Sequence, residues 1–202
     1  MKITVLDSKD AVAGALAERV ASTLRAKPDA VLGLASGRTP VDGYAELRRL
    51  HAAGSTDWSR ASTFNLDEFA GIDGRHPGSF RTFMERHLFG GVNLRAERIH
   101  FLNGVAKDLN AECDRYEGAI AEAGGIDLQL LGIGTNGHIG FNEPADDLPV
   151  RTHRVRLMES TRRDNAMLFD NDPSRVPVEA LSPYEPTMMV EASALMETAH
   201  PK

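Results

Sequence analysis

The fold of this chain is decided around residues 130–144, which read Leu130-Leu-Gly-Ile-Gly-Thr-Asn-Gly-His-Ile-Gly-Phe-Asn-Glu-Pro144. They continue an apolar run that begins at Ile126. A short apolar run that ends in a glycine cluster is typical of a buried strand, and the glycines let the backbone approach a ligand closely. An imidazole, a side-chain amide and a carboxylate follow the turn. Because α/β enzymes carry their chemistry at the carboxyl ends of parallel strands, we expect an active-site loop here.

The same loop matches the dinucleotide-binding spacing, with glycines at 132, 134 and 137. That fingerprint requires a helix to begin at the last glycine, so that the helix N-terminus meets the pyrophosphate. Here the chain continues with another glycine and with Pro144, without helical periodicity. The glycines are therefore expected to serve a small substrate and not a nicotinamide cofactor.

Composition indicates a soluble globular protein. The chain has 202 residues, of which 42% are hydrophobic and 26% charged, with a net charge of −6. This charge disfavours nucleic acid and anionic membranes as partners. The single cysteine, Cys113, predicts a reducing cytoplasmic location, and its helical context predicts a packed thiol and not a nucleophile. The start, MKITVLDSKD, has no signal-peptide pattern, and no apolar run is long enough to span a membrane.

Strands and helices alternate along the chain. Strands are expected at 2–6, 30–35, 61–66, 98–102, 126–131 and 154–158. Helices are expected at 9–26, 40–53, around 80–88, at 108–123, and from a Ser160 cap to about 169, with Thr39 capping the second. The alternation predicts an α/β fold of the three-layer, Rossmann-like type, with a mostly parallel sheet and helices on both faces. No linker or repeat interrupts it, so residues 1–202 are expected to form one domain.

The first strand end with distinctive residues is Ser36-Gly37-Arg38-Thr39. Small residues at a helix N-terminus expose backbone N–H groups to an anion, and the hydroxyl and guanidinium groups add donors. The segment is consistent with a phosphate-binding loop, but equally with a plain helix cap beside a solvent-facing arginine.

The second strand end carries Asp67 and Glu68. Burial at a sheet edge can raise the pKa of a carboxyl group toward working pH, which makes Asp67 a candidate general base. The alternative is a carboxylate that caps the following loop. Glu68 is interpreted as structural, accepting hydrogen bonds from nearby backbone.

The third strand end carries His138, whose ordinary pKa suits proton transfer at neutral pH. Glu143, across a turn, could hold the imidazole tautomer and stabilise the charged ring. A lone histidine is more often structural, but this one lies between glycines and beside Asn136 and Glu143. No metal site is expected, because no other histidine is suitably spaced and no cysteine cluster exists.

Several motifs, in order, resemble the signature segments of the glucosamine-6-phosphate deaminase family, which is related to 6-phosphogluconolactonase. They are Ser36–Pro40, Phe64–Phe69 with His76-Pro77, Leu102–Gly104, Gly132–Pro144, Phe169–Asp172 and Val176-Pro177. The resemblance extends to about Leu181. The lactonases usually carry an Asp-Glu-Arg segment and a Gly-His-Thr-Ala-Ser loop, which this chain lacks.

The resemblance implies conversion of D-glucosamine 6-phosphate and water to D-fructose 6-phosphate and ammonia, in amino-sugar catabolism. Asp67 would move a proton from C2 to C1, and His138 would assist ring opening beside Asn136, oriented by Glu143. Ser36, Gly37, Arg38 and Thr39 would bind the phosphate of the sugar. The family needs no metal or organic cofactor, and it includes both monomers and homo-oligomers.

The chain also departs from the family pattern. Met167 stands where some members have a phosphate-binding arginine, and residues 182–202 form a divergent tail in a chain shorter than the family. The missing part normally supplies sheet, helix and a phosphate-binding lysine. Two alternatives therefore stand beside the deaminase: a truncated, non-catalytic sugar-phosphate-binding homologue, and a lactonase-like hydrolase.

Overall fold

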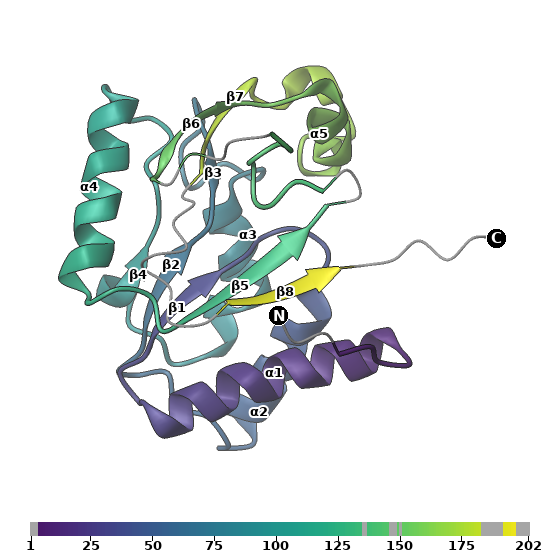
Figure 1. Cartoon of the computed structure of the whole chain (residues 1–202), viewed down its shortest axis with the longest axis vertical. Coiled ribbons are helices and arrows are strands. Elements are labelled where there is room, and N and C mark those ends of the chain that lie inside the picture. Colours follow the sequence, from purple (N-terminus) through teal and green to yellow (C-terminus); the bar gives the residue numbers. More distant parts are fainter. Residues whose placement is uncertain (1–3, 135–136, 146–148, 150, 183–191, 197–202) are drawn as a thin grey trace.

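A parallel sheet forms the centre of the molecule (Figure 1). The computed structural model describes residues 4–134, 137–145, 149, 151–182 and 192–196, the last five by their backbone alone. Within them the sheet has the order β4 (Ile99–His100), β2 (Ser62–Asn65), β1 (Val31–Leu34), β5 (Leu128–Ile133) and β8 (Ala192–Met196), and every neighbouring pair is parallel. The expected α/β fold with a mostly parallel sheet is confirmed.

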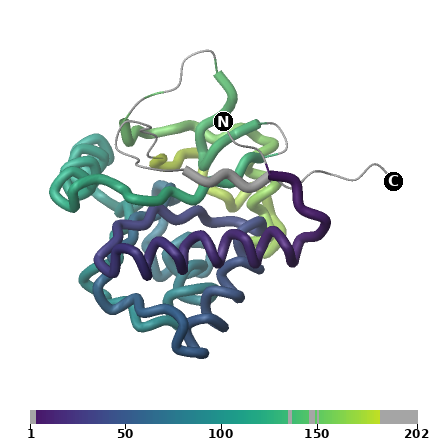
Figure 2. The backbone as a smooth tube through the Cα atoms, turned by 60° about the horizontal axis from the view of Figure 1, so that its bottom comes forward, coloured from purple at the N-terminus to yellow at the C-terminus, as the bar shows by residue number. Residues whose placement is uncertain are grey.

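Helices cover both faces of this sheet. They are α1 (Lys9–Ala26), α2 (Val41–Ala52), α3 (Phe80–His87), α4 (Leu109–Glu122) and α5 (Glu159–Asp164), with 3₁₀ helices η1 (Phe89–Gly91), η2 (Ala96–Arg98), η3 (Ala166–Leu168) and η4 (Pro173–Arg175). Figure 1 shows α4 on one side of the sheet and α1 and α2 on the other, and Figure 2 shows α1, in purple, running alongside α2.

Alternation along β1 explains the layers. Leu32 and Leu34 pack in the larger core cluster with side chains of α1, α2 and α3, whereas Val31 packs with Phe64 and the inner face of α4. Successive side chains of a strand point to opposite faces, so a strand covered on both sides is apolar at every position. All four residues of β1 are buried, as the uninterrupted apolar run predicts.

Several expected boundaries are confirmed and two caps are wrong. The first helix spans Lys9–Ala26 as expected, and Asp108 caps α4. The second helix begins one residue late, after Pro40, because a turn from the Val41 N–H to the Arg38 carbonyl comes first; Thr39 does not cap it. Ser160 lies inside α5 and does not cap it either, since the preceding Met158 is extended.

The two ends of the chain differ from expectation. Residues 2–3 lie outside the described residues, and Thr4, Val5 and Leu6 form no strand; Val5 is 88% exposed. Within the described part of the chain, β4 and β8 form the two edges of the main sheet, and residues 4–6 belong to neither sheet. The sequence pattern assigns no element after Leu181; there the structure has β8, which pairs in parallel with β5 over Gln129 to Ile133.

A second, smaller sheet lies beyond the carboxyl ends of the main one. It has the order β3 (Glu68–Phe69), β7 (Glu179–Ser182) and β6 (His153–Arg156), and both pairs are antiparallel. The strand expected at 154–158 thus exists as β6, one residue earlier at its start and two shorter at its end, but outside the parallel sheet. Its half-buried, alternating residues suit an antiparallel edge.

We expect Gly118→Ala to stabilise the protein by about 0.5–1 kcal/mol, because glycine in the middle of a helix costs conformational entropy. Gly118 is exposed within α4, and an added Cβ would meet no atom within 4 Å. Urea unfolding followed by circular dichroism measures the change. Gly71→Ala is the contrast: Gly71 also has open space but a φ of +88°, so alanine there should destabilise. Equal signs for the two variants would contradict this prediction.

Candidate active site

The candidate site lies where the chain direction across the sheet reverses. From β1 the chain continues to β2 on one side, whereas β5 pairs with β1 on the other. The loops after β1 and β5 therefore diverge and leave a crevice at the carboxyl ends, which is where open α/β sheets bind ligands. A pocket of about 210 Å³ occupies this position, and it is lined by residues from the loops after β1, β2 and β5.

The loop after β1 forms one wall of the pocket through Ser36, Gly37, Arg38 and Thr39. Gly37 has a φ of +93°, a conformation that side chains other than glycine rarely adopt, and it lets the loop turn toward α2. The Arg38 side chain is exposed, and it forms no ion pair or hydrogen bond with any residue that the structure describes. A guanidinium group and two hydroxyl groups before a helix N-terminus suit an anion.

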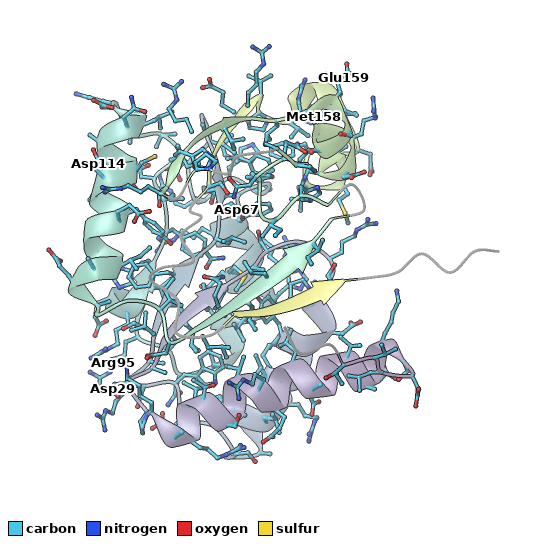
Figure 3. The ribbon with its side chains drawn as sticks, in the orientation of Figure 1. Asp29, Asp67, Arg95, Asp114, Met158 and Glu159 are labelled. Atoms are coloured by element: carbon cyan, nitrogen blue, oxygen red, sulfur yellow. The ribbon has the colours of Figure 1, made fainter. Side chains whose placement is uncertain are left out.

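Asp67 lines the pocket, and Figure 3 shows it near the middle of the molecule. Its side chain is only 4% exposed, and Ser36 Oγ donates to its Oδ1 at 2.8 Å. Burial raises the pKa of Asp67 to about 7, against the opposing hydrogen bond from Ser36 and with a further contribution from the charge of Glu68. A carboxyl group with a pKa near neutrality can both accept and return a proton.

Glu68 is not among the lining residues of the pocket, but it is also buried. Its Oε1 accepts from the backbone N–H groups of Phe69, at 2.9 Å, and Phe80, at 3.1 Å. Its Oε2 accepts from Ser79 Oγ, at 2.6 Å, and from the Arg81 N–H, at 3.2 Å. Burial raises the pKa of Glu68, while these hydrogen bonds lower it. The interpretation of Glu68 as a structural acceptor of backbone hydrogen bonds is confirmed.

The loop after β5 brings His138 into the same pocket as Asp67. The Gly134 N–H donates to the His138 carbonyl at 2.8 Å and closes a turn of this loop. Gly137 and Gly140 have φ values of +92° and +59°, in the left-handed region that favours glycine. A Cβ on Gly134 would lie 2.1 Å from His138 Cε1, so the imidazole ring packs directly over that glycine. Residues 137–145 contain no helix, and the arrangement that a dinucleotide fingerprint requires is not formed.

Glu143 is half-buried and anchors the start of α5. Its Oε1 accepts from Thr161 Oγ1 and from the Met158 N–H, the latter at 3.4 Å. A carboxylate from a distant loop therefore lies where Ser160 was expected to act, which suits the positive end of a helix. Asn136 lies outside the described residues. The catalytic roles of His138, Glu143 and Asn136 stay predictions.

Some lining residues are not found by sequence reasoning. Phe80 and Phe83 are expected only as the apolar face of a helix, and the end of α5 with η3 adds Asp164, Asn165, Met167 and Leu168. Helical periodicity could have suggested the two aromatic rings, but it cannot tell a pocket wall from a core. For Asp164 and Asn165 the sequence carries no signal. Met167 is 55% exposed and lines the pocket, where the resemblance places an arginine in some family members.

Cys113 is not part of the site. It is buried on the inner face of α4, and burial raises the pKa of its thiol to about 11. A thiol that is neutral at physiological pH is a poor nucleophile. The prediction of a packed thiol is confirmed.

Together the fold and the pocket define a Rossmann-like α/β protein with the Ser36–Thr39 loop and the buried Asp67 carboxyl group at its switch point. A family model described as "Glucosamine-6-phosphate isomerases/6-phosphogluconolactonase" matches residues 7–162, and the chain belongs to this family. Among the described residues, no helix has the length and apolar character needed to cross a lipid bilayer.

Curated relatives are 46–49% identical to this chain over the residues that align with it. Glucosamine-6-phosphate deaminase 1 of Giardia intestinalis is 49% identical over 90% of this chain and 68% of its own length. Glucosamine-6-phosphate deaminase 2 of Bacillus subtilis is 46% identical over 94% of this chain and 76% of its own.

Among solved structures, this chain is more similar to a glucosamine-6-phosphate deaminase than to a 6-phosphogluconolactonase. A monomeric glucosamine-6-phosphate deaminase has a TM-score of 0.91 and 40% identity, over 97% of this chain and 81% of its own. A 6-phosphogluconolactonase from Thermotoga maritima has a TM-score of 0.71 at 19% identity, over 96% of this chain and 81% of its own, and that likeness extends to the fold alone.

Proposed function

We propose that this chain is a glucosamine-6-phosphate deaminase, which converts D-glucosamine 6-phosphate and water to D-fructose 6-phosphate and ammonia. The observation that carries the proposal is the buried Asp67 carboxyl group, with its pKa near 7, in a pocket whose wall includes the Ser36–Thr39 loop and its exposed Arg38 side chain. Relatives named for this reaction, at 46–49% identity, support the same substrate.

The proposed reaction needs one mobile proton on Asp67. Its carboxylate removes the proton from C2 of the open-chain amino sugar, giving an enolamine and a neutral carboxyl group. Returning that proton to C1 leaves an imine at C2. Water then adds to C2, the C2–N bond breaks, and ammonia leaves with the ketose as product. A positioned acid or base of this kind contributes about 10²–10⁴-fold.

The other groups prepare the substrate for this transfer. His138 is proposed to move a proton to and from the ring oxygen as the pyranose opens, since it lines the pocket with Asp67. Glu143 and Asn136 are proposed to hold the loop and ring of His138. Ser36, Gly37, Arg38 and Thr39 are proposed to bind the phosphate, with Ser36 also holding Asp67 through its hydroxyl group.

Purified protein incubated with D-glucosamine 6-phosphate tests the proposal. We expect ammonia and fructose 6-phosphate to appear in equal amounts. Parallel assays with 6-phosphogluconolactone, and thermal shift with glucosamine 6-phosphate, cover the alternatives. Lactone hydrolysis without deamination would make it a hydrolase, and stabilisation without turnover would make it a binding protein.

Two finer features belong to the proposal. A single cysteine and a phosphorylated metabolite as substrate support a cytoplasmic location, which fractionation with a compartment marker would test. Homo-oligomerisation rests on the family resemblance alone, and light scattering of the purified chain decides between monomer and oligomer.

A further inference from the structure

The residue next to Asp67 joins three parts of the molecule. The backbone of Glu68 lies in β3 and pairs with Leu181 of β7, while its side chain reaches the first turn of α3. Only 1% of Glu68 is exposed. The same short segment thus connects the end of β2, the smaller sheet and α3, whose Phe80 lines the pocket.

Both oxygens of Glu68 are fully used as acceptors. Each oxygen accepts two hydrogen bonds. Of these four bonds, three come from backbone N–H groups and one comes from the Ser79 hydroxyl group. A protonated carboxyl group would have to donate one bond in place of accepting it, so this arrangement favours the ionised form. The N-terminus of α3 adds its positive partial charge.

We propose that Glu68 is a positioning residue for the proton transfer at Asp67. Its side chain holds the segment next to Asp67 against the first turn of α3, and its negative charge favours the protonated form of the neighbouring Asp67 carboxyl group. The kinetic part of this inference rests on the proposed function, in which Asp67 alternates between its charged and neutral forms.

Glu68 follows Asp67 in the chain and is buried, and its charge contributes to the raised pKa of Asp67. From the elements packed around Asp67, the titratable or charged groups are Tyr44 on α2, Tyr116 on α4, and Arg38, His138 and Asp164 around the pocket. Burial raises the pKa of both tyrosines, so they are neutral at working pH. Removing the charge of Glu68 therefore removes a fixed negative charge that the pocket residues do not replace.

Glu68→Gln and Ser79→Ala form a contrasting pair. Glu68→Gln removes the charge and replaces one accepting oxygen by an NH₂ group that cannot accept from the backbone N–H groups. Ser79→Ala keeps the charge and removes only the hydrogen bond from the Ser79 hydroxyl group. We expect Glu68→Gln to move the acid limb of the kcat/KM profile to lower pH by about one unit. The reason is that a neighbouring negative charge, at an effective dielectric constant of about 20, raises the pKa of a carboxyl group by roughly this amount. Ser79→Ala should leave that limb in place and lower kcat by about three- to tenfold, with KM little changed.

A titration of the Asp67 carboxyl carbon by ¹³C NMR, assigned with Asp67→Asn, provides a readout that needs no turnover. The Asp67 midpoint should fall in Glu68→Gln and stay in Ser79→Ala. An unmoved midpoint in folded Glu68→Gln overturns the inference. If Glu68→Gln does not fold, Ser79→Ala decides: a wild-type kcat would refute the positioning role. Absence of deamination by the wild-type chain would defeat the proposed function alone, since the NMR titration still tests Glu68.

Discussion

Asp67→Asn is expected to lower kcat for deamination by about 10²–10⁴-fold, because the amide cannot accept the C2 proton. KM should change far less, since the loop proposed to bind the phosphate, with its Arg38, stays in place. The substituted side chain can still accept the Ser36 hydrogen bond through its amide oxygen, so the loss reports on proton transfer and not on the shape of the pocket. Steady-state kinetics of ammonia release measure both constants.

The control is Asp29→Asn, which also removes one carboxylate. Asp29 is exposed and lies far from Asp67 (Figure 3), with an ion pair to Arg60 at 3.8 Å. An exposed pair of this kind contributes little to stability. Its kcat should equal that of the wild type. If Asp67→Asn retained more than about a tenth of wild-type kcat, Asp67 would not be the base.

The pH dependence of the wild-type enzyme follows from the same carboxyl group. The base must be ionised to accept a proton, and burial raises the pKa of Asp67 to about 7. We expect kcat/KM to fall as the pH drops below about 7, where an ordinary aspartate would stay active to about pH 4. A flat profile from pH 5 to 8 would contradict an Asp67 pKa near neutrality.

Asp67→Asn should also be more stable than the wild type at alkaline pH. The pKa of Asp67 is about 7 in the folded chain and 3.8 when exposed, so between these values the folded state holds a proton that the unfolded state has released. The free energy of unfolding therefore falls as the pH rises from 3.8 to 7, by at most roughly 4 kcal/mol, and is then constant. The amide of the variant carries no charge at any pH and avoids this loss.

Melting temperatures of the two proteins at pH 5 and pH 8 test this linkage. The advantage of Asp67→Asn should widen toward pH 8, to about 5 °C or more. A difference in melting temperature that is constant with pH, or that favours the wild type at pH 8, would mean that folding does not raise the pKa of Asp67.

Local sequence patterns were sufficient to predict the layers of the fold and the positions of the three strand ends that carry Ser36, Asp67 and His138. The uninterrupted apolar run of β1 predicts a strand covered on both faces, and the glycines after β5 predict a turn that brings His138 to the strand end. The sequence cannot show that Ser36 donates to Asp67, because that bond joins two strands whose order depends on tertiary pairing. The Ser36–Thr39 loop and Asp67 come from different strand ends in the sequence, and the structure places Ser36 within hydrogen-bonding distance of Asp67.

Long-range contacts also explain the wrong expectations. Serine is a common N-cap residue, which made Ser160 a reasonable expectation. A group from a distant part of the chain can take over the capping hydrogen bonds, and local sequence does not reveal it. Glu143, 15 residues before Met158, accepts from the Met158 N–H and from Thr161. In the same way, β6 matches the periodicity of a strand, yet periodicity does not distinguish the parallel sheet from the antiparallel one.

Gly134→Ala is expected to abolish most of the deaminase activity while the protein stays folded. The added Cβ would lie 2.1 Å from His138 Cε1 and 2.4 Å from both ring nitrogens, so the imidazole must leave its position. The three atoms nearest to the added methyl group all belong to the ring, and relaxation therefore moves the ring and not the loop. Displacing a positioned acid–base group should cost about 10²–10⁴-fold in kcat/KM.

Gly118→Ala is the matched control, because it adds the same methyl group at a glycine with nothing within 4 Å. It should keep wild-type kcat/KM, whereas Gly134→Ala should lose activity with a melting temperature within a few degrees of the wild type. The His138 ring resonances in ¹H–¹⁵N spectra should shift in Gly134→Ala alone. Full activity in that variant, with its ring signals displaced, would show that His138 is a structural residue of this loop and would remove it from the proposed mechanism.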